Sequence, residues 1–475
     1  MLFNKRYKEI FFFVSVLLFF FISCIYWVLD FSKAGFQWFL EIYIWDTFFL
    51  FGFDSISMLF LFLTSLIIPL CLLFNWNNDK DLNTQEQFFF FFIIFLIEIL
   101  LFLVFISLEL VFFYIVFEFL LIPFYFLIVL YNTKQYMRNV ATVNKKMNAF
   151  FLLFFYTIFG SLLMFLGILI IYINLGTTLI PLLWYSKLNI FLEHFLWFLF
   201  FISFSVKIPI VPVHLWLPEA HVESPTEGSV ILAAILLKIG LYGFLRILIP
   251  SFHEATIYYS IFVWMLCIFS VIYTSMSASV QVDIKRIIAY ASIGHMNISV
   301  LGLFSLDVFS ISGSILLMFA HGLASAGLFF VIGMLYNRFH TKNIKYFNGI
   351  VTVMPLLSTC FFFFIVSNFG MPGTLNFIGE FFIFTSFFKN NIFFIFLCVF
   401  LSILLCSFYS IYLYNHVVFG NNNRFFHYFI SDINIHEFVI LGVLMVAIFL
   451  TGIFPFYISD LYKLDLYYYF YYYYY

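Results

Sequence analysis

Charged side chains are scarce in this sequence. Of its 475 residues only 9% are Asp, Glu, Lys or Arg, against 65% hydrophobic residues, and the formal net charge is -2. A soluble globular protein needs more polar surface than this composition supplies, so the composition excludes that class. The nearly neutral charge, without a block of basic residues, also excludes nucleic-acid binding.

Cysteine is scarce as well, and its positions form no recognisable site. Six cysteines are scattered through apolar segments without C-x-x-C spacing or paired histidines: Cys24, Cys71, Cys267, Cys360, Cys398 and Cys406. We interpret them as small core residues and expect no disulfide, zinc or iron–sulfur site. The ten-residue alternation typical of a membrane β-barrel is absent too.

Long apolar runs are abundant instead. About 20 apolar residues cross roughly 30 Å of hydrocarbon as a helix. Such runs lie near 11–29, 47–74, 88–106, 108–131, 148–174, 193–213, 229–249, 256–280, 285–305, 309–335, 351–389, 391–419 and 436–458. They predict an all-α polytopic membrane protein with about 13–14 transmembrane helices. The count depends on 351–389, which is too long for one span and contains the break "NFGMPGTLN".

Several charged residues, Glu98 among them, lie at predicted membrane depth, and four are singled out as functional: Glu118, Lys207, Lys238 and Glu380. An ionisable group there costs roughly 2.5–3.5 kcal/mol, which favours a functional interpretation. A buried lysine holds its proton more tightly when a carboxylate is near, so making or breaking one Lys–Glu contact loads or unloads a proton. These residue types therefore indicate proton transport rather than bond-making catalysis.

Three further groups leave two interpretations open. Arg246 lies near a span end before Pro250, where its side chain either has a function or extends to the membrane interface. His295 and His321 are either core histidines or part of the same proton path.

The segment "VKIPIVPVH" at 206–214 combines Lys207 with two helix breakers. Pro209 and Pro212 lack N–H groups and leave carbonyls without partners one turn earlier. Such a break is tolerated at membrane depth where it lines a hydrated cavity. Gly240 and Gly243 predict close packing of the helix that carries Lys238.

Several sequence blocks are similar to a known family. They are "KIPIVPVHLWLPEAHVESPTEGSVILAAILLKIGLYGFLR" from 207, "LELVFFYIVFEFLLIPFYFLI" from 108, "VDIKRIIAYASIGHMNISVLG" from 282, "MFAHGLASAGLFF" from 318 and "MPGTLNFIGEF" from 371. With these blocks the chain resembles the proton-pumping antiporter-like subunits of respiratory complex I, NADH:ubiquinone oxidoreductase. The resemblance covers roughly residues 88–390.

The resemblance implies a proton relay made of Glu118, Lys207, Lys238, His295, His321 and Glu380. Lys207 would lie on the broken helix of a first half-channel, with Glu118 as its acidic partner and Lys238 as the central relay. Glu380 would be the terminal acid of a second half-channel. Most members of the family carry lysine at that position, so Glu380 favours the one member that carries glutamate.

The family's fold implies two inverted five-helix repeats, each with a discontinuous helix at "KIPIVP" or "GMPGTLNF". We expect N-terminal helices in 1–87, the two half-channel repeats in 88–250 and 251–419, and a C-terminal helix with a Tyr-rich tail in 420–475. Only two spans precede residue 88, where the family has three. An N-terminal helix is therefore expected to be missing or supplied by another chain.

The resemblance also implies which chemistry lies elsewhere. The chain would act as a subunit of an NADH:ubiquinone reductase without a redox centre of its own, so NADH, FMN, iron–sulfur clusters and ubiquinone would bind partner subunits. The expected partners are other membrane-arm subunits, including sibling antiporter-like subunits, and membrane lipids. The expected location is the mitochondrial inner membrane, with a bacterial plasma membrane as the less favoured alternative.

Two alternative functions remain open at this point. The same buried Lys and Glu pattern suits a subunit of a multi-subunit cation/proton antiporter. The buried charges could also hold helices together in a structural spacer.

Overall fold

The computed structural model describes residues 7–30, 33–44, 47–76, 84–130, 140–389, 393–420 and 431–471. The chain divides into two compact units. The first unit comprises Met1–Pro209, Ile235–Val263 and Ser459–Tyr475, and the second comprises Ile210–Ala234 and Trp264–Ile458. Each unit therefore combines segments that are distant in the sequence.

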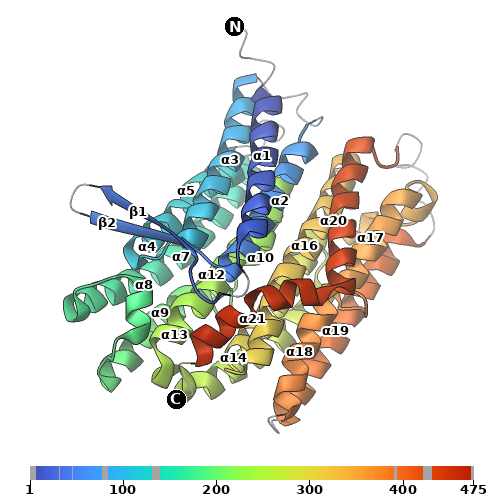
Figure 1. The fold of residues 1–475 in the computed structure, drawn as a ribbon. Helices are drawn as coiled ribbons and strands as arrows, with labels where there is room; N and C mark the ends of the chain where they lie inside the picture. The colour runs from blue at the N-terminus through green and yellow to red at the C-terminus, as the bar shows by residue number, and fades with distance from the viewer. Residues whose placement is uncertain are drawn as a thin grey trace. The chain divides into compact units, whose positions relative to one another are not determined.

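The helices of the first unit come from the N-terminal half of the chain and from its C-terminal end. They are α1 (Tyr7–Val28), α2 (Ser55–Phe74), α3 (Thr84–Ile106), α4 (Leu110–Phe119), α5 (Leu121–Tyr125), η2 (Phe126–Leu130), α7 (Val140–Leu175), α8 (Ile180–Tyr185), α9 (Ile190–Lys207), α12 (Leu237–Gly243), η4 (Phe244–Leu248), α13 (Ile249–Ser251) and most of α21 (Pro455–Tyr471). Figure 1 shows α1, α2 and α3 side by side, and each packs against the other two.

The helices of the second unit surround α16. They are α10 (Trp216–Glu223), α11 (Thr226–Ile231), α15 (Ile284–Leu303), α16 (Val308–Phe339), η5 (Ile344–Tyr346), η6 (Ile350–Thr352), α17 (Pro355–Asn368), α18 (Leu375–Lys389), α19 (Phe393–Val418) and α20 (Ile435–Ile453). Three elements cross the boundary between the units: η3 (Leu232–Leu236), α14 (His253–Val280) and the start of α21. Helix α16 packs against α15, α17, α18 and α20, which explains its almost complete burial.

A small hairpin corrects the predicted span at 47–74. β1 (Trp38–Ile44) pairs antiparallel with β2 (Thr47–Phe53), with Trp38 opposite Phe53. Helix α2 begins only after Asp54, whose carboxylate accepts the N–H of Ser57 at 2.9 Å while the Ser57 hydroxyl approaches the Asp54 N–H. This capping box stops the aromatic run from continuing as one helix. Composition alone did not reveal it, because β2 is as apolar as a membrane helix.

Both predicted helix breaks are present. Helix α9 ends at Lys207, and the chain resumes a helix only at Trp216, so "IPIVPVHL" is not helical. The long run 351–389 is divided into α17 and α18 by a turn in which Gly370 and Gly373 have φ values of 74° and 97°. Such positive φ values favour glycine. The run therefore forms two helices rather than one.

Within the described ranges, ten helices are long and apolar enough to cross a membrane, and two apolar helices are shorter. This is fewer than the predicted 13–14 for physical reasons. Lys285, Arg286 and Asn297 lower the hydropathy of α15, and the glycine turn shortens α17 and α18. When α15, α17, α18 and α19 are included, each predicted span contains a helix. The all-α polytopic prediction is confirmed, and the inverted relation of the repeats stays a prediction.

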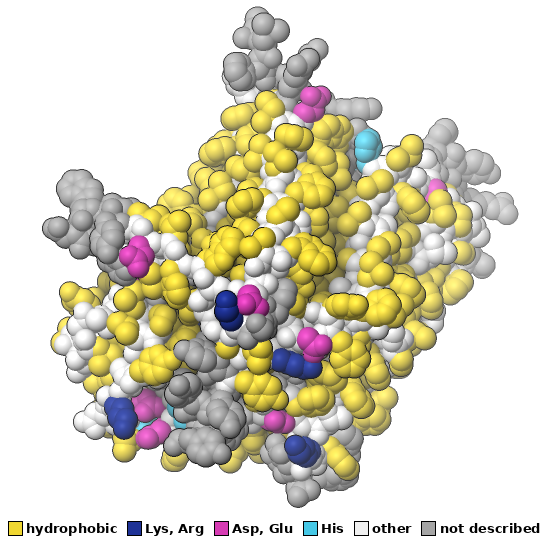
Figure 2. Space-filling view, in the orientation of Figure 1, with side chains coloured by type: hydrophobic (Ala, Val, Ile, Leu, Met, Phe, Trp, Pro, Cys, Tyr) yellow, Lys and Arg dark blue, Asp and Glu magenta, His cyan; other side chains and the backbone are white. Residues whose placement is uncertain are grey.

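The outer surface is largely apolar. Figure 2 shows one face on which hydrophobic side chains predominate and charged ones are few. On α7, for example, Phe155 and Phe159 are 64% and 65% exposed. A contiguous apolar surface of this kind suits contact with lipid rather than water.

Candidate functional site

In the first unit, the sequence-predicted residues Lys207 and Glu118 face the same interior region. Lys207 is the last residue of α9 and is only 2% exposed, and Glu118 lies near the end of α4. Their charges interact, although no direct ion pair joins them among the described contacts. The Lys207 Nζ instead lies 4.1 Å from the centre of the Phe117 ring. Lysine and acid are thus near enough to influence each other and are not locked together.

Phe117 was missed by the sequence interpretation. It precedes Glu118 on α4, and its ring is almost completely buried. An ammonium group over an aromatic face gains about 0.5–2 kcal/mol, so the ring stabilises the protonated lysine. The sequence offers no signal for this role, because Phe117 is one of 79 phenylalanines.

Lys238 lies on α12, close to the end of α9. Its side chain is fully buried. A Cβ added at Gly240 would lie 3.2 Å from the Lys207 Cβ and 2.6 Å from the Ile208 Cγ1. The missing side chain therefore lets the helix that carries Lys238 approach the residue that carries the other lysine. The predicted close packing at Gly240 is confirmed, and so is that at Gly243, which faces the Phe204 ring.

In the second unit, the sequence-predicted residues Glu380 and His295 are in direct contact. The His295 Nδ1 lies 3.1 Å from the Glu380 Oε1, and both side chains are 3% exposed. The His321 ring centre is 5.6 Å from that of His295. These three residues come from α18, α15 and α16. Such a cluster can hold a proton on either the carboxyl group or the imidazole.

Cys406 lies on the other side of the His295 ring, which the interpretation of the cysteines as core residues did not predict. Its Sγ is 3.5 Å from the His295 Nε2 and 3.0 Å from the Tyr409 hydroxyl. Both residues belong to α19. Neither residue could be identified from the sequence, because no sequence pattern shows that α19 packs against α15.

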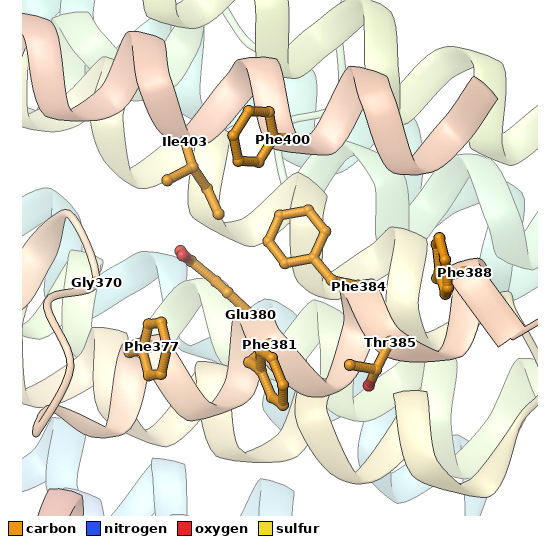
Figure 3. Close-up of a pocket in the computed structure, with 9 residues that line it drawn as sticks. All are labelled: Gly370, Phe377, Glu380, Phe381, Phe384, Thr385, Phe388, Phe400 and Ile403. Atoms are coloured by element: carbon orange, nitrogen blue, oxygen red, sulfur yellow. The ribbon is translucent and has the colours of Figure 1, made fainter. Parts of the chain in front are cut away.

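Glu380 also borders a pocket of about 450 Å³ between α18 and α19 (Figure 3). Its other walls are mostly apolar: Gly370, Phe377, Phe381, Phe384, Thr385, Phe388, Phe400 and Ile403. A Cβ at Gly370 would lie 2.9 Å from the Glu380 Oε2, so the glycine turn between α17 and α18 makes room for the carboxylate. The helix break and the acid therefore form one structural feature.

Arg246 does not extend to the membrane interface. Its guanidinium lies 2.5 Å from the Asp54 carboxylate, and the two side chains are 1% and 0% exposed. The Phe36 ring centre lies 4.8 Å from the guanidinium carbon. Arg246 therefore forms a buried ion pair with Asp54. It does not lie at the membrane interface, and its partner is not one of the predicted relay residues.

The relay candidates thus form two groups. Glu118, Lys207 and Lys238 lie in the first unit, and His295, His321 and Glu380 in the second. Among the described residues, no group of three or more His, Cys, Asp or Glu side chains could hold a metal ion. The chemistry available to both groups is proton binding and release.

Buried Lys, Glu and His side chains near two broken membrane helices are typical of ion-translocating membrane proteins. Residues 107–406 match the family model described as "NADH:quinone oxidoreductase/Mrp antiporter, TM". The NADH-ubiquinone oxidoreductase chain 4 of Acanthamoeba castellanii is 42% identical over 92% of this chain and 86% of its own length. That of Arabidopsis thaliana is 43% identical over 91% and 86%. The chain therefore belongs to the NADH-ubiquinone oxidoreductase chain 4 family.

Solved structures share the fold. A chain in "Respiratory complex I from Thermus thermophilus with bound NADH" has a TM-score of 0.83 at 24% identity. The alignment covers 97% of this chain and 97% of that one. A chain in "Structure of Mrp complex from Dietzia sp. DQ12-45-1b" has a TM-score of 0.85 at 16% identity, covering 98% of this chain and 92% of its own. At these identities the likeness concerns the fold alone. Glu380 favoured the family member that carries glutamate at this position, which is chain 4. The names of the curated relatives agree with that choice.

Proposed function

We propose that this chain moves protons across the mitochondrial inner membrane as a membrane-arm subunit of an NADH:ubiquinone oxidoreductase. Membership of the chain 4 family supports the assignment to that enzyme. The observation that carries the proton-moving role is the contact of 3.1 Å between the His295 Nδ1 and the Glu380 Oε1, buried beside a helix break. Ionisable side chains at membrane depth are costly to keep unless they have a function.

The proposed path uses both groups of residues: Glu118, Lys207, Lys238, His295, His321 and Glu380. In the first group, Lys207 exchanges its proton as the influence of Glu118 strengthens or weakens, and Lys238 receives the proton on the neighbouring helix. In the second group, the histidines carry the proton to or from Glu380. The helix breaks favour this role, because irregular backbone at membrane depth is tolerated where it lines a hydrated cavity.

Electron transfer would take place in other subunits of the assembly. NADH, FMN, iron–sulfur clusters and ubiquinone are assigned to those partners, and this chain supplies only proton-binding groups. Its partners would include sibling antiporter-like subunits and the surrounding lipids. Coupling would then consist of partner movements that change how Lys207 and Glu118 interact.

A subunit of a cation/proton antiporter is the second candidate, and the likeness to the Mrp complex structure favours it. That likeness rests on 16% identity, whereas the chain 4 proteins of Acanthamoeba castellanii and Arabidopsis thaliana are 42% and 43% identical. Activity of the purified assembly separates the two. NADH oxidation coupled to proton uptake supports the first function, and sodium-dependent proton exchange without NADH oxidation supports the second.

Alanine substitution tests the relay. Lys207→Ala and Glu118→Ala each remove one proton-binding partner, so NADH-driven proton uptake in vesicles should fall by roughly 10²-fold, the low end of what a positioned proton-transfer group contributes. Lys187→Ala, at an exposed loop position, is the matched control and should leave uptake unchanged. The assembled complex is quantified for every variant. Control-level uptake in both relay variants would refute the assignment.

A further inference from the structure

The polar contacts around Glu380 continue beyond His295. The imidazole lies between Glu380, 3.1 Å from Nδ1, and Cys406, whose Sγ is 3.5 Å from Nε2. The Cys406 Sγ is in turn 3.0 Å from the Tyr409 hydroxyl, one helical turn further along α19. None of the four side chains is more than 8% exposed. Together they form an unbroken row of protic groups that ends at the carboxylate.

The donor and acceptor capacities of these groups give the row a direction. An ionised carboxylate only accepts hydrogen bonds, and a neutral imidazole has one N–H and one accepting nitrogen. When Glu380 is ionised, the His295 proton therefore lies on Nδ1, and Nε2 accepts from the Cys406 thiol. The Tyr409 hydroxyl then donates to the Cys406 sulfur. Every hydrogen in the row points toward Glu380.

We infer that Cys406 and Tyr409 form the proton-delivery side of His295, so that protons reach this imidazole at Nε2 and pass from Nδ1 to Glu380. The inference rests on the proposed function. In the transfer, the Nδ1–H bond breaks as an O–H bond forms on Glu380 Oε1, and the thiol proton moves to Nε2. The hydroxyl proton of Tyr409 moves to sulfur, and a proton arriving from solvent restores the hydroxyl. Only Glu380 ends the transfer with an added proton.

A small cavity lies beside the row. It has a volume of about 10 Å³ and is lined by His295, Cys406 and Tyr409 together with polar groups of neighbouring helices, including Thr274 and Tyr290. A cavity of this size, with several polar partners, has room for roughly one water molecule. Packing alone explains a buried cysteine. It does not explain why the Cys406 sulfur contacts both the His295 Nε2 and the Tyr409 hydroxyl.

Substitutions in the intact assembly test the inference. Cys406→Ala and Tyr409→Phe each interrupt the row, so NADH-driven proton uptake should fall by roughly 10²-fold, as expected for a positioned proton-transfer group. Cys406→Ser keeps a protic group and should retain most of the rate. Cys267→Ala is the matched control, since Cys267 is fully buried on α14 and lines no part of the row.

Infrared spectroscopy provides a readout that a packing role would not change. The S–H stretching band of Cys406, identified by its loss in Cys406→Ala, should shift in Tyr409→Phe and again in Glu380→Gln, because both ends of the row polarise the thiol. Control-level proton uptake in Cys406→Ala and Tyr409→Phe would overturn the inference. So would an unmoved band together with equal losses in Cys406→Ala and Cys406→Ser. Wild-type uptake in Glu380→Gln would instead refute the proposed function itself.

Discussion

At the scale of single residues, the setting of Lys207 differs from a simple ion pair. Its ammonium group lies 4.1 Å from the Phe117 ring centre, and no described contact joins it directly to Glu118. A buried ion pair of good geometry would hold the proton firmly. An aromatic face stabilises the cation by only about 0.5–2 kcal/mol, which leaves the proton easier to remove. The contact with Phe117 therefore fits the proposed role of Lys207, in which the lysine releases its proton repeatedly.

Replacing Phe117 with leucine tests this role. The substitution removes the ring while keeping an apolar side chain, so protonation of Lys207 loses up to about 2 kcal/mol of support and coupled turnover should slow several-fold. Phe113→Leu is the control, because Phe113 is equally buried on α4 and stacks on Phe117 without facing the lysine in the described contacts. NADH-driven proton uptake is measured at matched levels of assembly. Equal rates in the two variants would remove Phe117 from the mechanism.

The residues also show what sequence reasoning can single out as a candidate. Lys207, Lys238 and Glu380 were identifiable because a charge in an apolar run is conspicuous. Phe117, Cys406 and Tyr409 were not, since aromatic and small apolar residues are the background of this chain. Their roles depend on which helix faces which, and no local pattern encodes that.

At the scale of elements, helix breaks and glycines position the residues of the proposed relay. Both predicted breaks are present because proline and glycine act locally, whereas the β1–β2 hairpin was missed because its residues are as apolar as those of a span. Gly240 has a different role from a break. It lies within α12 and allows the close approach to the end of α9.

Gly240→Ala should therefore destabilise the protein. The new Cβ would lie 2.6 Å from the Ile208 side chain and would separate α12 from α9, at a cost of about 1–3 kcal/mol. Gly442→Ala on α20 is the matched control, because no atom lies within 4 Å of its added Cβ. Alanine in a helix is favoured over glycine by roughly 0.5–1 kcal/mol, so this variant should be slightly more stable. Thermal unfolding of the purified assembly should show shifts of opposite sign, and a shared sign would contradict this account of Gly240.

At the scale of the whole molecule, the C-terminal helix folds back on the beginning of the chain within the first unit. Asp465 on α21 accepts the Gly35 N–H at 2.7 Å and the Ser55 N–H at 3.1 Å, and it also bonds the Ser55 hydroxyl. These contacts join residues more than 400 positions apart. The Tyr-rich end gave no sequence signal for this arrangement, and α21 was not predicted. The docking of α21 therefore depends on hydrogen bonds from the Gly35 and Ser55 N–H groups to the Asp465 carboxylate.

The docking of α21 should weaken as the pH rises. Burial, and then the negative charge of Asp54, raise the pKa of Asp465 from 3.8 to about 6, and α21 is not among the helices that could span a membrane. Between pH 3.8 and about pH 6, Asp465 therefore keeps its proton when α21 is docked and has lost it when α21 is undocked. The docking free energy therefore falls by about 3 kcal/mol across that window and is constant above it. Hydrogen-exchange protection of the α21 amides, corrected for intrinsic rates, should fall between pH 4 and pH 6 in the wild type. In Asp465→Asn, which stays neutral, it should be flat, whereas parallel profiles in both proteins would show that another group controls the docking.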